Sequence, residues 1–174
     1  MQWVIATAAL ALVVGGVIAE PAAANWQYSR WGMTLAELQA ASPAVRSLNA
    51  KQAKAASVPV IGEALAESAY ETKDFKFRAT FLFKAGGLVA VYLKPLRDSE
   101  YPKVEHMLGQ VYGTPAKAAD KPWLGDNCRE VSKEWLDGSS GTLVTMMATY
   151  CIPPVQSFFS LIYRPVLSKE ATGL

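Results

Sequence analysis

The clearest pattern in the chain is an alternation of apolar and mainly polar residues near its middle. The apolar positions are Phe75, Phe77, Ala79, Phe81 and Phe83. A period of two predicts a strand that buries one face. The segment 84–87 contains two glycines, so it predicts a hairpin turn that leads into a second strand over 88–94. A weaker alternation predicts another strand over 64–71.

A second hairpin is predicted further along the chain. Two runs rich in strand-forming residues, 130–136 and 142–150, flank the turn sequence Gly138-Ser139-Ser140-Gly141. Pairing them around this turn puts Trp135 on an apolar face and leaves Lys133 as the charged exception on that face. One buried and one wet face is typical of a half-covered antiparallel sheet. A last strand is predicted over 155–164.

The two cysteines of the chain, Cys128 and Cys151, fit the register of this hairpin. With Ser139 and Ser140 at the centre of the turn, facing residues have numbers that sum to 279, as the two cysteines do. Facing residues in an antiparallel pair have Cα atoms about 4.5 to 5.5 Å apart, which a disulfide tolerates. We therefore predict a Cys128–Cys151 disulfide. The alternative is a free-thiol, redox-active or metal-binding role for the two cysteines. They have neither the CxxC spacing nor the histidine partners that would support such a role.

Three helices are predicted from capping signals and apolar spacing. Thr34 and Glu37 form a capping box that starts the first helix. A second helical stretch is expected over 43–55, because the preceding Ser-Pro pair stops one helix and can cap the next. A third is expected from Asp98 to Gly113, where apolar residues recur at helical spacing. The following segment, 114–127, is predicted to be a loop.

The order of these elements predicts the fold class. Helix, three strands, helix and three strands indicate an α+β domain with possible tandem α-β-β-β halves over 32–95 and 98–165. We expect an antiparallel sheet of about six strands with the helices on one face. The 150 residues of segment 25–174 are enough for a single domain with its own core.

The first residues predict export. Segment 1–24 contains the apolar run Val4 to Ala19 and ends in Ala22-Ala23-Ala24, which suits signal-peptidase cleavage near Ala24. The alternative is an uncleaved membrane anchor, but a spanning helix needs roughly 20 residues. We expect a periplasmic or secreted protein with no membrane span after processing. In that compartment a disulfide is stable.

Charge and the inventory of reactive residues favour binding over catalysis. Removing 1–24 takes away Glu20 and leaves 17 basic and 14 acidic side chains, and the basic ones are scattered rather than gathered in a stripe, so no nucleic-acid partner is expected. His106 is the only histidine, and no serine lies in a Gly-x-Ser-x-Gly elbow. No cofactor, metal site or catalytic residue is predicted. A small hydrolase or lipid-modifying enzyme that uses His106 is the alternative.

Trp123 is the residue most suited to a binding role, because tryptophans in loops often anchor contacts with a partner. The competing interpretation is that Trp123 covers the edge of the core.

The segment Trp31-Gly32-Met33-Thr34-Leu35-Ala36-Glu37 resembles the Trp-Gly-Met-Ser/Thr-x-x-Glu opening of many small exported bacterial proteins of uncharacterised function. That resemblance implies an envelope or secreted protein. We therefore expect a non-enzymatic module that binds a protein or envelope component, through the open face of its sheet or through the Trp123 loop, or that stabilises a larger envelope complex.

Overall fold

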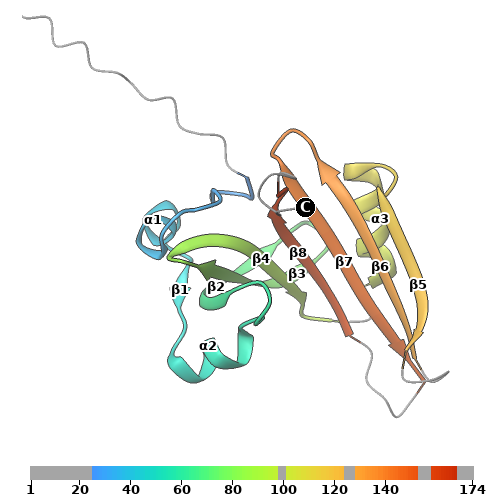
Figure 1. Ribbon diagram of the computed structural model, residues 1–174, viewed down its shortest axis with the longest axis horizontal. Coiled ribbons are helices and arrows are strands. Elements are labelled where there is room, and N and C mark those ends of the chain that lie inside the picture. Colours follow the sequence, from blue (N-terminus) through green and yellow to red (C-terminus); the bar gives the residue numbers. More distant parts are fainter. Residues whose placement is uncertain (1–24, 98–100, 124–127, 153–157, 168–174) are drawn as a thin grey trace, which may run out of the picture.

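The computed structural model describes residues 25–97, 101–123, 128–152 and 158–167, and these form one antiparallel sheet with three helices (Figure 1). The sheet has eight strands, so the predicted count of about six was wrong. The strands are β1 (Arg46–Ser47), β2 (Glu63–Glu71), β3 (Lys76–Lys84), β4 (Gly87–Pro95), β5 (Lys117–Trp123), β6 (Cys128–Asp137), β7 (Thr142–Cys151) and β8 (Phe158–Pro165). The helices are α1 (Leu35–Ala41), α2 (Ala50–Ala56) and α3 (Tyr101–Tyr112).

The strand order is β1-β2-β3-β4-β8-β7-β6-β5. Two consecutive meanders, β1 to β4 and β5 to β8, therefore meet where β4 pairs with β8. Their junction aligns Val91 with Tyr163 and Leu93 with Leu161. Each meander has four strands, so the predicted α-β-β-β halves were wrong. The extra strands are the short β1 and the edge strand β5.

One face of the sheet, here called the core face, carries the main hydrophobic core. Phe81, Val91, Trp135, Val144 and Leu161 alternate onto this face from five strands, and each is at most 2% exposed. Helices α1 and α3 and the segment 25–33 contribute further buried apolar side chains to the same cluster, and α3 lies behind β5 and β6 in Figure 1. The core therefore spans both meanders.

The opposite face, here called the second face, is covered over only part of its area. Ala64, Leu82, Ala90 and Ile162 form a smaller buried cluster there. The segment around α2 packs against it through partly buried residues such as Ala56. The prediction that all helices share one face was therefore wrong. An alanine-rich helix with no broad apolar stripe carries too weak a signal to indicate which face it covers.

The Trp-Gly-Met-Thr segment attaches the start of the domain to β4. The Gly32 amide donates to the Leu88 carbonyl and the Leu88 amide donates to the Met33 carbonyl, both at 2.8 Å. Gly32 has a φ of +84°, which favours glycine at this position. Thr34 then caps α1 with Glu37, as the sequence predicted. The conspicuous residues of this segment thus have a structural explanation.

Two further elements differ from the sequence prediction. α2 begins at Ala50 rather than at residue 43, because Asn49 and Gln52 form its capping box. The strand β1 lies before it. β5 occupies much of the predicted loop 114–127, while residues 98–99, the expected cap of α3, lie outside the described residues.

The hairpin of β6 and β7 has the predicted register. Cys128 pairs with Cys151 and Trp135 pairs with Val144. Trp135 is buried, and its indole N–H donates to the Gly113 carbonyl at 3.0 Å, which ties the hairpin to the end of α3. Lys133, the charged residue on the apolar face, forms an ion pair with Glu105 of α3. A charge is therefore tolerated on this face because it has a partner.

Candidate functional site

The disulfide predicted from the sequence is present. Cys128 and Cys151 are bonded, with their Cα atoms 4.1 Å apart, and no described cysteine is free. The bond closes the open end of the β6–β7 hairpin. Trp123 pairs with Cys128 at the end of β5, so its backbone lies beside the disulfide. Its side chain lies outside the described part of the chain, and its role in binding stays a prediction.

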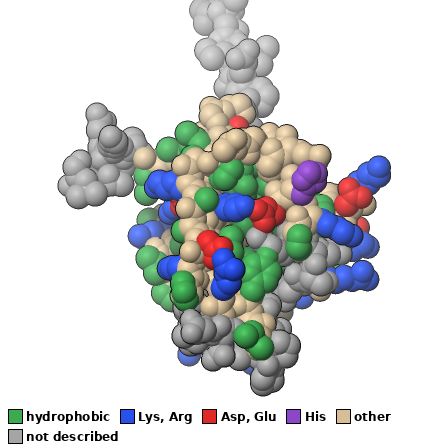
Figure 2. Space-filling view, turned by 90° about the vertical axis from the view of Figure 1, so that its right-hand side faces the viewer, with side chains coloured by type: hydrophobic (Ala, Val, Ile, Leu, Met, Phe, Trp, Pro, Cys, Tyr) green, Lys and Arg blue, Asp and Glu red, His purple; other side chains and the backbone are tan. Residues whose placement is uncertain are grey.

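His106 lies on the exposed side of α3, where the single histidine appears purple on the molecular surface (Figure 2). It lines an open pocket of about 520 Å³ together with Asp74, Lys103 and Met107. The lining residues include no serine, threonine or cysteine that His106 could activate as a nucleophile. The pocket supplies one carboxylate and one ammonium group, and nothing in it points to a particular reaction.

The described residues contain no group of three or more histidine, cysteine, aspartate or glutamate side chains placed to hold a metal ion. None of the described helices is both long and apolar enough to cross a membrane. The leader-like segment 1–24 lies outside the described residues, so its cleavage stays a prediction.

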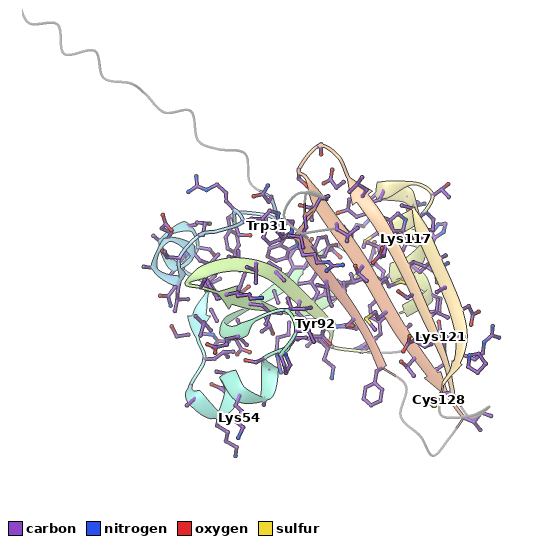
Figure 3. All side chains as sticks on the ribbon, in the orientation of Figure 1. Trp31, Lys54, Tyr92, Lys117, Lys121 and Cys128 are labelled. Atoms are coloured by element: carbon purple, nitrogen blue, oxygen red, sulfur yellow. A yellow bond between two sulfur atoms is a disulfide. The ribbon has the colours of Figure 1, made fainter. Side chains whose placement is uncertain are left out.

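The second face over β5 to β8 carries a ladder of charged residues along its outer strands. Lys121 of β5 lies 3.0 Å from Glu130 of β6, and Lys117 lies 3.6 Å from Glu134. Figure 3 shows both lysines along β5, with Cys128 at the end of the neighbouring strand. Exposed pairs of this kind contribute little to stability, about 0 to 1 kcal/mol each. They form a polar rim beside the next two strands.

Inside this rim, on β7 and β8, two large apolar side chains are exposed on the second face. Met147 of β7 is 40% exposed and Phe158 of β8 is 48% exposed. Met147 faces Ser160 and Phe158 faces Thr149, so Met147 and Phe158 are diagonal neighbours across the strand pair. Neither belongs to the buried cluster that the α2 segment covers on this face. We call Met147 and Phe158 the apolar pair.

A cleft lies elsewhere on the second face, between α2 and strands β2 to β4. It has a volume of about 520 Å³. The wall on the α2 side includes the apolar residues Leu48, Ala55, Ala56 and Val58 together with Gln52 and Ser57, and Tyr92 of β4 lies on the sheet side. Figure 3 shows Tyr92 on the sheet, while Lys54 extends from α2 away from it. We call this space the α2 cleft.

The polar side of the α2 cleft contains two basic residues. Arg78 of β3 and Lys94 of β4 face each other directly in the antiparallel ladder, and both line the cleft. Glu67 of β2 also lines it and lies 3.9 Å from Arg78. Lys94 forms no ion pair with a described residue. The cleft thus combines an apolar wall with a cationic edge.

Sequence reasoning identified the disulfide but missed the α2 cleft. The strand alternation indicated that Arg78 lies on the polar side of its strand, but not which residue faces it. Leu48 and Ala55 gave no signal of their own. The cleft is visible only once the strand register and the position of α2 are known.

Comparison of the chain with protein-family models, curated proteins and solved structures gives no significant match. The geometry of the second face is therefore the basis for a functional proposal.

Proposed function

We propose that this protein is an exported, non-enzymatic binding module that contacts a protein or envelope component through the second face of its sheet over β6 to β8. The observation that carries this proposal is the apolar pair. Met147 and Phe158 are 40% and 48% exposed on this face, outside the buried cluster that the α2 segment covers. The same face over β2 to β4 is covered by the segment around α2.

The composition around the apolar pair supports a protein contact. Protein interfaces commonly place exposed aromatic residues and methionine at the centre and charged residues at the rim. Here the rim is the lysine–glutamate ladder of β5 and β6. Both β7 and β8 carry a large apolar side chain that is exposed to water. A partner that covers these side chains removes apolar area from water, which favours binding.

Export is part of the proposal because three features favour it. Segment 1–24 has the composition of a signal peptide. The disulfide between Cys128 and Cys151 is a bond that persists mainly in oxidising compartments. The Trp31 to Glu37 segment resembles the opening of small exported bacterial proteins.

Export is tested by expressing the full chain with an epitope tag, followed by cell fractionation and N-terminal sequencing of the product. A product that stays in the cytoplasm and still begins at residue 1 contradicts the proposal.

The binding surface is tested by capture on immobilised, oxidised protein comprising residues 25–174. Envelope extract is passed over the wild type and over Met147→Glu and Phe158→Glu, and bound proteins are identified by mass spectrometry. Val111→Glu is the matched control, because Val111 lies on α3 and is 63% exposed. We expect a stoichiometric partner on the wild type and the control that is lost from the two second-face variants. Equal capture by all four proteins contradicts the proposal.

The end of β5 around Trp123 is the alternative contact surface and is tested in the same experiment. Trp123→Ala with unchanged thermal stability should lose the partner if Trp123 carries the contact. Retention of the partner by Trp123→Ala, together with loss in Phe158→Glu, locates the contact on the sheet face. Melting curves followed by circular dichroism confirm that each variant is folded.

A further inference from the structure

The pairing of Arg78 with Lys94 has an electrostatic cost in the isolated protein. Like charges directly opposite each other in an antiparallel pair destabilise the sheet. Arg78 is partly compensated by Glu67 at 3.9 Å, whereas Lys94 has no ion-pair partner among the described residues. An anion bound between the two side chains would remove this repulsion. The cationic edge therefore favours a ligand with a negative group.

The rest of the α2 cleft is suited to an apolar group. Its helix side presents Leu48, Ala55 and Ala56 beside the polar residues Gln52 and Ser57, and Tyr92 contributes a partly buried ring from the sheet. The side chains of Gln52 and Ser57 hydrogen-bond within the α2 segment, to Asn49 and Ala53. The volume of about 520 Å³ lies within the range of roughly 300 to 1,000 Å³ that is typical of small-molecule sites. A folded protein partner could not enter a space of this size, but a small molecule can.

We propose that the α2 cleft binds a small amphiphile with one anionic head group. The head group, a carboxylate or a phosphate monoester, lies between Arg78 and Lys94, and the apolar body lies along Ala55 and Leu48 of the opposite wall. The site is separate from the apolar pair, so it goes beyond the proposed protein contact and does not depend on it. No covalent step is involved.

The structure of α2 is compatible with ligand entry. The helix has only seven residues, Ala50–Ala56, and none of its side chains is fully buried. It contacts the sheet mainly through β2. Because few buried contacts hold it, small movements of this wall have a low free-energy cost and can adjust the cleft to the ligand.

The proposal is tested by titrating residues 25–174 with dodecanoate and with dodecyl phosphate in a calorimeter, below the concentrations at which these probes form micelles. Dodecyltrimethylammonium, with the same chain and a positive head group, is the control for apolar contact alone. We expect saturable binding of at least one anionic probe and none of the cationic one. The head group that binds more tightly identifies the ligand class. Equal binding of anionic and cationic probes overturns the proposal, as does failure of both anionic probes to bind.

Charge and shape variants separate this site from unspecific attraction. Lys94→Glu should weaken binding of the anionic probe at least tenfold, whereas Lys103→Glu, which makes the same change in net charge on α3, should leave it unchanged. Ala55→Trp places a large ring in the cleft from an exposed position on α2 and should abolish binding. Circular dichroism melting curves verify that all three variants fold. If Lys94→Glu or Ala55→Trp binds the anionic probe with wild-type affinity, the proposal is overturned. If either variant still captures the protein partner, the α2 cleft and the protein contact at the apolar pair are independent of each other.

Discussion

At the scale of single residues, Gly62 is the described glycine at which the backbone leaves least room for a side chain. A Cβ atom there would lie 2.7 Å from the carbonyl oxygen of Phe83. That neighbour is backbone within β3, so it cannot rotate away. We expect Gly62→Ala to lower the free energy of unfolding by about 1 to 3 kcal/mol, as overpacked substitutions do.

Gly109 provides the matched control for this substitution. It lies in α3, and a Cβ atom there would have nothing within 4 Å. Because alanine is the better helix former, we expect Gly109→Ala to raise stability by roughly 0.5 to 1 kcal/mol. Urea denaturation measures both variants. If Gly62→Ala were as stable as the wild type, the close approach of Gly62 to Phe83 would be contradicted.

The ionisation of Asp137 makes the stability of the turn between β6 and β7 depend on pH. Its carboxylate accepts hydrogen bonds from the hydroxyl groups of Ser139 and Ser140, at 2.6 and 2.7 Å. These hydroxyls, Ser139 first, hold the pKa of Asp137 below its ordinary value of 3.8. Because the pKa is lowered in the folded state, the stabilisation is fully present above 3.8 and is lost as the pH falls through the folded-state pKa.

The comparison of Asp137→Asn with the wild type tests this dependence. At neutral pH we expect the variant to be less stable, because its amide carries no charge to accept the two hydroxyl hydrogen bonds. The difference should narrow as the pH falls below 3.8. Thermal unfolding across this pH range measures it. A constant difference at all pH values would show that the charge of Asp137 contributes nothing.

At the scale of elements, the β6–β7 hairpin is stabilised both by the backbone pairing of its strands and by its disulfide. Cys128 and Cys151 are 23 residues apart, and cross-linking a loop of this size restricts the unfolded chain by on the order of 3 kcal/mol. We expect Cys128→Ala/Cys151→Ala to lose about that much stability yet keep a folded sheet, because the pairing from Arg129 to Asp137 needs no covalent bond. Denaturation of the wild type with and without a thiol reductant gives the independent measure. Unchanged stability on reduction would contradict the expectation.

The elements that the sequence predicted well are those whose signals agree. In the β6–β7 hairpin, the turn residues, the alternation and the two cysteines all indicate one register. In β3 the alternation alone was sufficient, because one side of the strand is lined by aromatic residues. β5 was missed for the opposite reason. Its residues Lys117–Trp123 have no apolar alternation, and the strand is held by pairing with β6 and by ion pairs such as Arg129–Asp120 at 2.5 Å.

The candidate sites show a similar division. His106 and Trp123 could be chosen from residue type alone, but residue type did not reveal what surrounds them. The apolar pair is formed by residues 147 and 158, and the α2 cleft by residues from 48 to 94. Both depend on which strands are neighbours. A local pattern indicates the face on which a residue lies, but only the order of strands determines its neighbours on that face.

At the scale of the whole molecule, the two meanders share one core. Phe81 and Val91 from the first meander lie in the same buried cluster as Trp135, Val144 and Leu161 from the second. Neither meander can therefore unfold without exposing the apolar side chains of the other. We expect a single cooperative unfolding transition, with the slowest-exchanging amides of β3 and β7 reporting the same free energy of opening.

Leu161→Ala tests this coupling at the junction of the two meanders. Leu161 is 1% exposed and faces Leu93 across the β8–β4 pair. Removing its side chain leaves a cavity that should lower the free energy of unfolding by about 2 to 5 kcal/mol. Native-state hydrogen exchange should show this loss equally in β3 and in β7, because both strands open only in the global transition. Loss of protection confined to β6, β7 and β8 would show instead that the second meander unfolds on its own and that the β4–β8 junction separates two independently stable units.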